Sequence, residues 1–230
     1  GIIAQHAQDP RLTVNAQMNE GVVSSKLGLT GWPAVAEEAI IARDILLAEH
    51  VESRLHICHL TTAGGVELIR FAKSRGIKVT AEVTPHHLLL TEELINGYDP
   101  VYKVNPPLRT EADVLALRAG LADGTIDIVA TDHAPHTLAE KSSGYWEAPS
   151  GGPLVQHALP ALFELSSQGV FSPELIVRKT SHAVADLFRI IDRGYIREGY
   201  FADLVLLSPE KPWTVDRTNV LAKCGWSPFE

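Results

Sequence analysis

The sequence has few cysteines, no long apolar run and no excess of positive charge, and each of these absences excludes a class of protein. Its 230 residues include only two cysteines, Cys58 and Cys224. Two cysteines are too few for a disulfide scaffold, so we expect a reducing, cytoplasmic compartment. No apolar run approaches the roughly 20 residues of a membrane-spanning helix. The net charge of −8 argues against a nucleic-acid surface. We therefore expect a globular protein that binds neither nucleic acid nor a membrane.

What the sequence does contain is an alternation of strand and helix patterns, which is typical of a parallel sheet with helical crossovers. Apolar segments predict strands at residues 2–6, 55–60, 78–85 and 126–131. Helices are expected between and after them, at residues 33–50, 65–74, 110–122, 154–167 and 173–188. A final strand is expected at residues 202–207, where it follows a glycine-rich turn and lies outside the strand–helix alternation. The pattern predicts an α/β fold.

Three of the predicted strands end in side chains that can bind a metal ion, namely His6, His59 and Asp132. Side chains alternate along a strand, so we place His59 on the face that Leu55 and Ile57 begin. If the strands are neighbours in a barrel, the three side chains converge at its carboxyl-terminal mouth. Two imidazoles and a carboxylate are a common ligand set for zinc. An unpaired aspartate there also needs a cation, because desolvating it costs roughly several kcal/mol.

Each of these residues has another interpretation when it is taken alone. His6 can be a loop or capping histidine, and His59 a histidine satisfied within the core. Asp132 can cap the segment that follows it. The metal hypothesis therefore depends on the joint pattern of three equivalent strand ends.

Several loop residues are further candidates for binding a ligand. Asn105 precedes two prolines that stiffen its loop, although a turn asparagine is equally expected there. His136 lies four residues beyond the strand-end aspartate and can reach a substrate carboxylate or carbonyl. Ser150 and Gly151 begin a stretch of bare backbone that either approaches a ligand closely or forms a flexible turn. The adjacent histidines at positions 86 and 87 cannot both face one site, so we expect a structural or supporting role for them.

Together these segments resemble the dihydroorotases, which belong to the amidohydrolase superfamily. The resemblance extends over almost the whole chain and is carried by Ala4–His6, Leu55–Gly64, Thr80–His87, Lys103–Arg109 and Ala130–His136. It implies a (β/α)8 barrel of the TIM type that is incomplete here. Residues 1–198 would be the carboxyl-terminal half of the barrel, and residues 199–230 a partial return into a small β-sandwich that includes the strand at 202–207.

The resemblance also implies a metal centre. His6 and His59 would be zinc ligands, and Asp132 both a zinc ligand and the catalytic acid or base. Two zinc ions are expected in a complete site. The family's His-x-His motif, its bridging carboxylated lysine or aspartate, and its substrate-binding arginine and asparagine are not found in the 230 residues. We therefore expect them upstream of Gly1, in a longer protein of which this chain is a piece.

For the substrate, the resemblance implies contacts from the side chains of Asn105 and His136 and from the backbone of Ser150 and Gly151. Many relatives have an aromatic residue at the position of Ser150, so that contact is lost or made differently here.

The activity that the resemblance implies is the zinc-dependent interconversion of N-carbamoyl-L-aspartate and dihydroorotate in pyrimidine biosynthesis, with the fragment alone inactive. One alternative is a hydantoinase, dihydropyrimidinase or allantoinase acting on another cyclic amide. Another is a non-catalytic dihydroorotase-like partner of a transcarbamoylase. Expected partners are a small-molecule substrate and either a second copy of the chain or aspartate transcarbamoylase.

Overall fold

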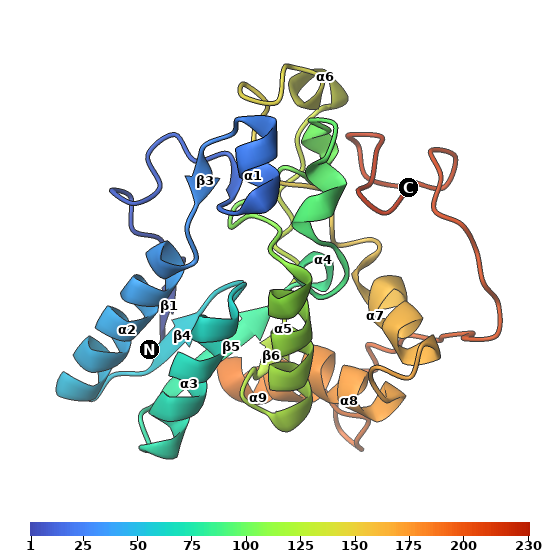
Figure 1. The fold of residues 1–230 in the computed structure, drawn as a ribbon. Helices are drawn as coiled ribbons and strands as arrows, with labels where there is room; N and C mark the ends of the chain where they lie inside the picture. Colours follow the sequence, from blue (N-terminus) through green and yellow to red (C-terminus); the bar gives the residue numbers. More distant parts are fainter.

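The computed structural model describes residues 1–230, and its centre is a four-stranded parallel sheet (Figure 1). In spatial order the strands are β1 (Ile3–Gln5), β4 (Leu55–Ile57), β5 (Val79–Val83) and β6 (Ile128–Val129). Ala4 lies opposite His56, and His56 lies opposite Thr80. Because the strands are parallel, all of their carboxyl ends lie at one edge of the sheet.

Three helices connect these strands and cover one face of the sheet: α2 (Val35–His50), α3 (Ala63–Ser74) and α5 (Glu111–Asp123). These helices confirm the predictions at 33–50, 65–74 and 110–122. Further along the chain, α7 (Ala158–Ser167) confirms most of the helix predicted at 154–167. The helix predicted at 173–188 is continuous but has a π-helical turn, in the order α8 (Pro173–Val177), η3 (Arg178–His182) and α9 (Ala183–Phe188).

Threonine side chains begin the helices that follow strands β4 and β5. Thr62 accepts a hydrogen bond from the Gly65 N–H at the start of α3. Thr84 accepts one from the His87 N–H at the start of α4 (Pro85–Leu89), where a proline occupies the first turn. Such caps satisfy backbone donors that have no partner within the helix. They allow the chain to turn abruptly from strand into helix at the carboxyl ends of β4 and β5.

The main core lies between the sheet and its covering helices. Leu55 and Ile57 of β4 are buried against apolar residues of α2 and α3, among them Ile41 and Ile69. Burial of side chains of this size stabilises the fold by about 1.5–3 kcal/mol each. The outward face of the sheet, meaning the face that α2, α3 and α5 cover, is thus buried by helices of this chain itself.

A smaller group of elements follows the carboxyl ends of the strands (Figure 1). It comprises β2 (Met18–Asn19), α1 (Val22–Leu27), β3 (Gly31–Trp32), η1 (Glu92–Ile95), η2 (Pro100–Tyr102) and α6 (Leu138–Lys141). Its own apolar cluster contains Met18, Val23, Leu29, Ile95 and Tyr145. The short elements of this group pack on one another rather than on the sheet, and they surround the strand ends.

The strand predicted at residues 202–207 is not formed. This segment has no regular secondary structure, is exposed and enters no β pairing. A strand is stabilised by hydrogen bonds to a neighbour, and no other strand of this chain pairs with it. The assignment of residues 199–230 to a β-sandwich unit stays a prediction.

The predicted fold class is confirmed as α/β with a parallel sheet. Its order of strands and helices is that of part of a (β/α)8 barrel. No helix combines the length and the apolar character that crossing a bilayer requires.

Candidate functional site

Two of the predicted metal ligands, His6 and His59, lie side by side at the ends of neighbouring strands. The Nδ1 atom of His6 is 2.9 Å from the Nε2 atom of His59, and the rings meet edge to face. His6 is exposed, whereas His59 is buried. Burial is the main cause that lowers the pKa of His59, and the neighbouring His6 lowers it further. The two rings therefore direct nitrogen atoms toward the same small region.

The route by which His59 reaches this position differs from the strand-alternation prediction. Leu55 and Ile57 point into the helix-covered core, so continued alternation would direct His59 there as well. Instead, β4 ends at Ile57 and the backbone at His59 turns into the left-handed region, with φ of 34°. The placement of His59 on the face of Leu55 and Ile57 is therefore wrong, and the turn accounts for its contact with His6.

Asp132, the third predicted ligand, stands apart from this pair. Its backbone also adopts a left-handed conformation, with φ of 47°. Its charge raises the pKa of His59, opposing the two larger effects. No three histidine, cysteine, aspartate or glutamate side chains form a metal-binding group. The separation follows from the sheet order, because β5 lies between β4 and β6 and strands are spaced about 4.8 Å apart.

The histidine pair fits a zinc ion in its donor atoms and spacing. Two imidazole nitrogens bound to one tetrahedral zinc at about 2.0–2.1 Å are roughly 3.3 Å apart, close to the separation seen here. The other ring nitrogen of His59, Nδ1, is buried without a hydrogen-bond partner and faces away from the pair's shared contact. Two ligands do not complete a tetrahedral set, so the pair is part of a centre rather than a whole one.

Next to the pair lies a polar network on the face of the sheet opposite α2 and α3, which was not predicted from the sequence. His56 contacts Thr80 Oγ1 through Nδ1 at 2.9 Å and Glu82 Oε2 through Nε2 at 3.0 Å. The other Glu82 oxygen accepts a hydrogen bond from the backbone N–H of His59 at 3.4 Å. Glu82 therefore supports the turn at His59. A charged residue alternating with apolar ones in 79–83 was the available signal.

The four predicted substrate contacts come from three loops that lie together. The Gly151 N–H donates to the Lys103 carbonyl, two residues before Asn105, and His136 Nε2 donates to the Ser150 carbonyl at 3.0 Å. Asn105 is exposed and its side chain makes no hydrogen bond within the chain. A Cβ atom on Gly151 would lie 2.6 Å from the Ala134 carbonyl oxygen. This position therefore requires glycine, which allows the two loops to touch.

Two buried lysines hold these loops, a role that was not predicted from the sequence. Lys141 donates to the carbonyls of Lys103 and Pro149, and Lys103 donates to the Gln17 side chain and to the carbonyls of Tyr145 and Trp146. Neither ammonium pairs with a carboxylate. Burial, followed by the charge of Lys103, lowers the pKa of Lys141 to about 8.

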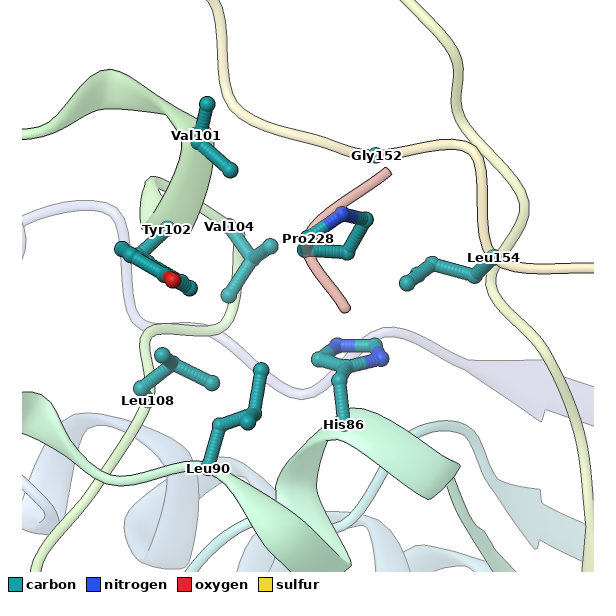
Figure 2. A pocket seen from close by; sticks show the side chains of 9 residues that line it. All are labelled: His86, Leu90, Val101, Tyr102, Val104, Leu108, Gly152, Leu154 and Pro228. Atoms are coloured by element: carbon teal, nitrogen blue, oxygen red, sulfur yellow. The ribbon is translucent and has the colours of Figure 1, made fainter. Parts of the chain in front are cut away.

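His86 and His87 have supporting positions, in agreement with their expected role. His87 donates from Nε2 to the Pro106 carbonyl, beside Asn105, and accepts from the Thr84 hydroxyl. Figure 2 shows that His86 points into an apolar pocket lined by Val104, Leu108, Gly152, Leu154 and Pro228, among others. The Nδ1 atom of His86 has no partner there, and burial lowers its pKa to about 3.

Comparison with known proteins identifies relatives over the whole chain. Residues 16–225 match the model of the amidohydrolase family. A dihydroorotase from Streptomyces coelicolor is 54% identical over 100% of this chain and 54% of its own length. A dihydroorotase from Leifsonia xyli is 58% identical over 91% of this chain and 48% of its own length. The chain thus spans about half the length of these relatives.

Among solved structures, an L-hydantoinase from Arthrobacter aurescens superimposes with a TM-score of 0.87 and 26% identity. The match covers 100% of this chain and 53% of the hydantoinase. These findings agree with the resemblance carried by the strand-end motifs and with the partial barrel. The chain belongs to the amidohydrolase family.

Proposed function

We propose that this chain contributes the carboxyl-terminal half of the barrel of a zinc-dependent dihydroorotase, which interconverts N-carbamoyl-L-aspartate and dihydroorotate. The observation that carries the proposal is the convergence of His6 Nδ1 and His59 Nε2 at 2.9 Å, in a chain that is 54% identical to a dihydroorotase. The geometry supports a metal-dependent hydrolase, and the relatives support the substrate.

In this proposal His6 and His59 hold zinc, together with Asp132 and ligands supplied from outside the chain. Bound zinc would polarise the amide carbonyl and lower the pKa of the attacking water. Asp132 would take a proton from that water and return it to the ring nitrogen as the carbon–nitrogen bond breaks. The Asp132 carboxylate is half-buried and makes no hydrogen bond within the chain, so both of its oxygens can accept.

The substrate-binding loops would hold the carboxylate of the substrate. The exposed Asn105 amide has no competing partner in the chain. His136 donates from Nε2 to the Ser150 carbonyl, so its Nδ1 atom donates to a substrate carboxylate only when the ring carries both hydrogens, and otherwise accepts a hydrogen bond from a ligand N–H. The Gly151 N–H and the Ser150 carbonyl are already engaged. Backbone contacts from this loop would therefore use the Ser150 N–H or the Gly151 carbonyl.

The decisive experiment is turnover by a full-length protein carrying this chain, compared across dihydroorotate, hydantoin and allantoin. We expect turnover of dihydroorotate. Preferential hydrolysis of hydantoin would favour the second candidate, a hydantoinase, which the superposition on the L-hydantoinase supports. No turnover of any cyclic amide, with binding to a transcarbamoylase, would instead indicate a non-catalytic partner.

Asp132→Asn tests the proposed chemistry within the same protein. We expect kcat/KM to fall by about 10²–10⁴-fold or more, because asparagine cannot carry the proton. Asp127→Asn is the matched control, since Asp127 lies beside the same strand but pairs with Lys73 of α3. Wild-type turnover by a folded Asp132→Asn protein would exclude the role of Asp132.

A further inference from the structure

His6 makes two side-chain contacts, and one of them decides which ring nitrogen carries the hydrogen. Its Nδ1 atom faces His59, and its Nε2 atom lies 2.9 Å from Oε1 of Gln8. A neutral imidazole has one N–H and one lone pair, and only a lone pair can bind a metal ion. The orientation of the Gln8 amide therefore matters for the chemistry of His6.

A hydrogen-bond chain that ends on the backbone sets that orientation. The Thr13 hydroxyl donates its only hydrogen to the Asp9 carbonyl at 2.9 Å. Toward Gln8 the hydroxyl can then only accept, and Gln8 Nε2 donates to it at 2.7 Å. The amide oxygen of Gln8 is thereby directed to His6. Because a carbonyl oxygen only accepts, His6 Nε2 carries the hydrogen and Nδ1 presents its lone pair toward His59.

Backbone contacts fix the position of Asp9, where this chain of hydrogen bonds ends. The Asp9 N–H donates to the Ala36 carbonyl near the start of α2, at 2.9 Å. The Asp9 side chain accepts from the backbone N–H of Arg11 at 2.8 Å, which closes the turn after β1. Thr13 is 8% exposed, so water has little access to compete for its hydroxyl. The arrangement is therefore built into the turn that follows the strand.

We propose that Gln8 and Thr13 are positioning residues that hold His6 in the tautomer whose Nδ1 atom is free to bind zinc. The inference rests on the proposed function, since it concerns the proposed ligand. The Thr13 side chain makes its hydrogen bonds to Gln8 and to the Asp9 carbonyl and none to His6, so we infer that its effect on His6 is transmitted through the Gln8 amide.

The test is the zinc affinity of a metal-depleted, full-length protein carrying this chain, measured by competition with a chelator. Gln8→Met keeps the length of the side chain and removes both hydrogen bonds. Thr13→Val keeps its shape and frees the Gln8 amide to turn its N–H toward His6, which favours the wrong tautomer. We expect both variants to bind zinc about 10–100-fold more weakly, as is typical for loss of a hydrogen bond that orients a ligating histidine.

Conservative variants provide the controls. Gln8→Glu retains an acceptor for His6 in the form of a carboxylate, which strengthens the basicity of the ring, so it should bind zinc at least as tightly as the wild type. Thr13→Ser retains the hydroxyl and should bind zinc like the wild type. Thr30→Val makes the same substitution at an exposed threonine outside the chain of contacts. Thermal unfolding of the metal-free proteins shows whether each variant folds. If Thr13→Val does not fold, the comparison of Gln8→Met with Gln8→Glu still decides the question.

The possible outcomes separate this inference from the proposed function. Equal zinc affinity of the folded Gln8→Met and Gln8→Glu proteins, or wild-type affinity of folded Thr13→Val, overturns the inference. Failure of the wild type itself to bind zinc overturns the proposed function.

Discussion

At the scale of single residues, the site depends on the candidate ligands and equally on the neighbouring side chains that position them. His6 and His59 were identifiable from the sequence because each ends an apolar segment. Glu82 stood out only as a charged residue in an apolar strand, and Gln8 did not stand out at all, because their roles depend on an atom of another residue being within hydrogen-bond distance. A sequence pattern indicates which residue types lie at a strand end, but it does not show which oxygen faces which nitrogen.

His86 gives the protein a defined response to acid. Its pKa is about 3 in the folded state against an ordinary value of 6.5, so the unfolded chain binds its proton first as pH falls. The free energy of unfolding should therefore decrease as pH falls from about 6.5 toward 3, by up to about 1.4 kcal/mol per pH unit from this one group. Above pH 6.5 both states are neutral and this contribution is constant.

The measurement is urea unfolding of a full-length protein carrying this chain, at pH 7, 6 and 5, for the wild type and for His86→Leu. The leucine variant should lose stability less steeply, because its side chain suits the apolar pocket and takes up no proton. His50→Gln, at an exposed position at the end of α2, is the control and should keep the wild-type slope. Identical slopes for wild type and His86→Leu would refute the prediction.

At the scale of elements, the long segments were predictable and the short ones were not. The strands and helices of the sheet follow from apolar runs and helical periodicity, which reflect burial against the core. Strands β2 and β3 contain two residues each, too few for any periodicity, and depend on pairing between Met18 and Gly31. The segment at 202–207 has the composition of a strand but no strand beside it. A local sequence pattern does not show whether such a pairing partner is present.

The same distinction explains the misplaced face of His59. Alternation is a property of extended backbone, and β4 stops being extended two residues before the histidine. Positive φ is uncommon in non-glycine residues, although histidine is among those that adopt it, so the sequence alone did not indicate the turn at His59. Surrounding contacts, such as that of Glu82 with the His59 N–H, stabilise the turn.

The loop that ends at Gly151 should depend on Lys141. In Lys141→Met the carbonyls of Lys103 and Pro149 lose their donor, and we expect opening of this loop to become easier by about 1–2 kcal/mol. Hydrogen exchange of the Gly151 amide should then accelerate by roughly tenfold, while amides of β5 are unchanged. Exposed Lys211→Met is the matched control. Unaltered exchange at Gly151 would show that the ammonium does not hold the loop.

At the scale of the whole molecule, the sheet is open at both sides. Strands β1 and β6 each have a single neighbour, and Leu204, Val205 and Leu206 are 66%, 73% and 97% exposed. Unpaired strand edges and apolar surface of this kind promote association between chains. The outward face, in contrast, is closed by its own helices.

We therefore expect the 230-residue chain, expressed alone, to aggregate or to form broad, concentration-dependent assemblies, and to be inactive. Co-expression with the amino-terminal half of a dihydroorotase should increase the soluble fraction, because it supplies partners for the sheet edges. Light scattering and analytical ultracentrifugation measure both effects. A monomer that is soluble alone and melts in one cooperative transition would contradict this expectation.

The left-handed backbone at His59 and Asp132 has a further consequence for how such a site can change over evolutionary time. Non-glycine residues in this conformation are strained by of order 1–3 kcal/mol each, and the surrounding structure must offset that strain. Glycine at either position would relieve the backbone strain but would remove the imidazole or carboxylate group. At these two positions, substitutions that stabilise the fold therefore conflict with keeping the catalytic chemistry. Asparagine tolerates this conformation and can replace Asp132 with little change in shape. A lineage that abandoned catalysis could therefore preserve the architecture through one conservative exchange, and shape alone would not reveal the loss.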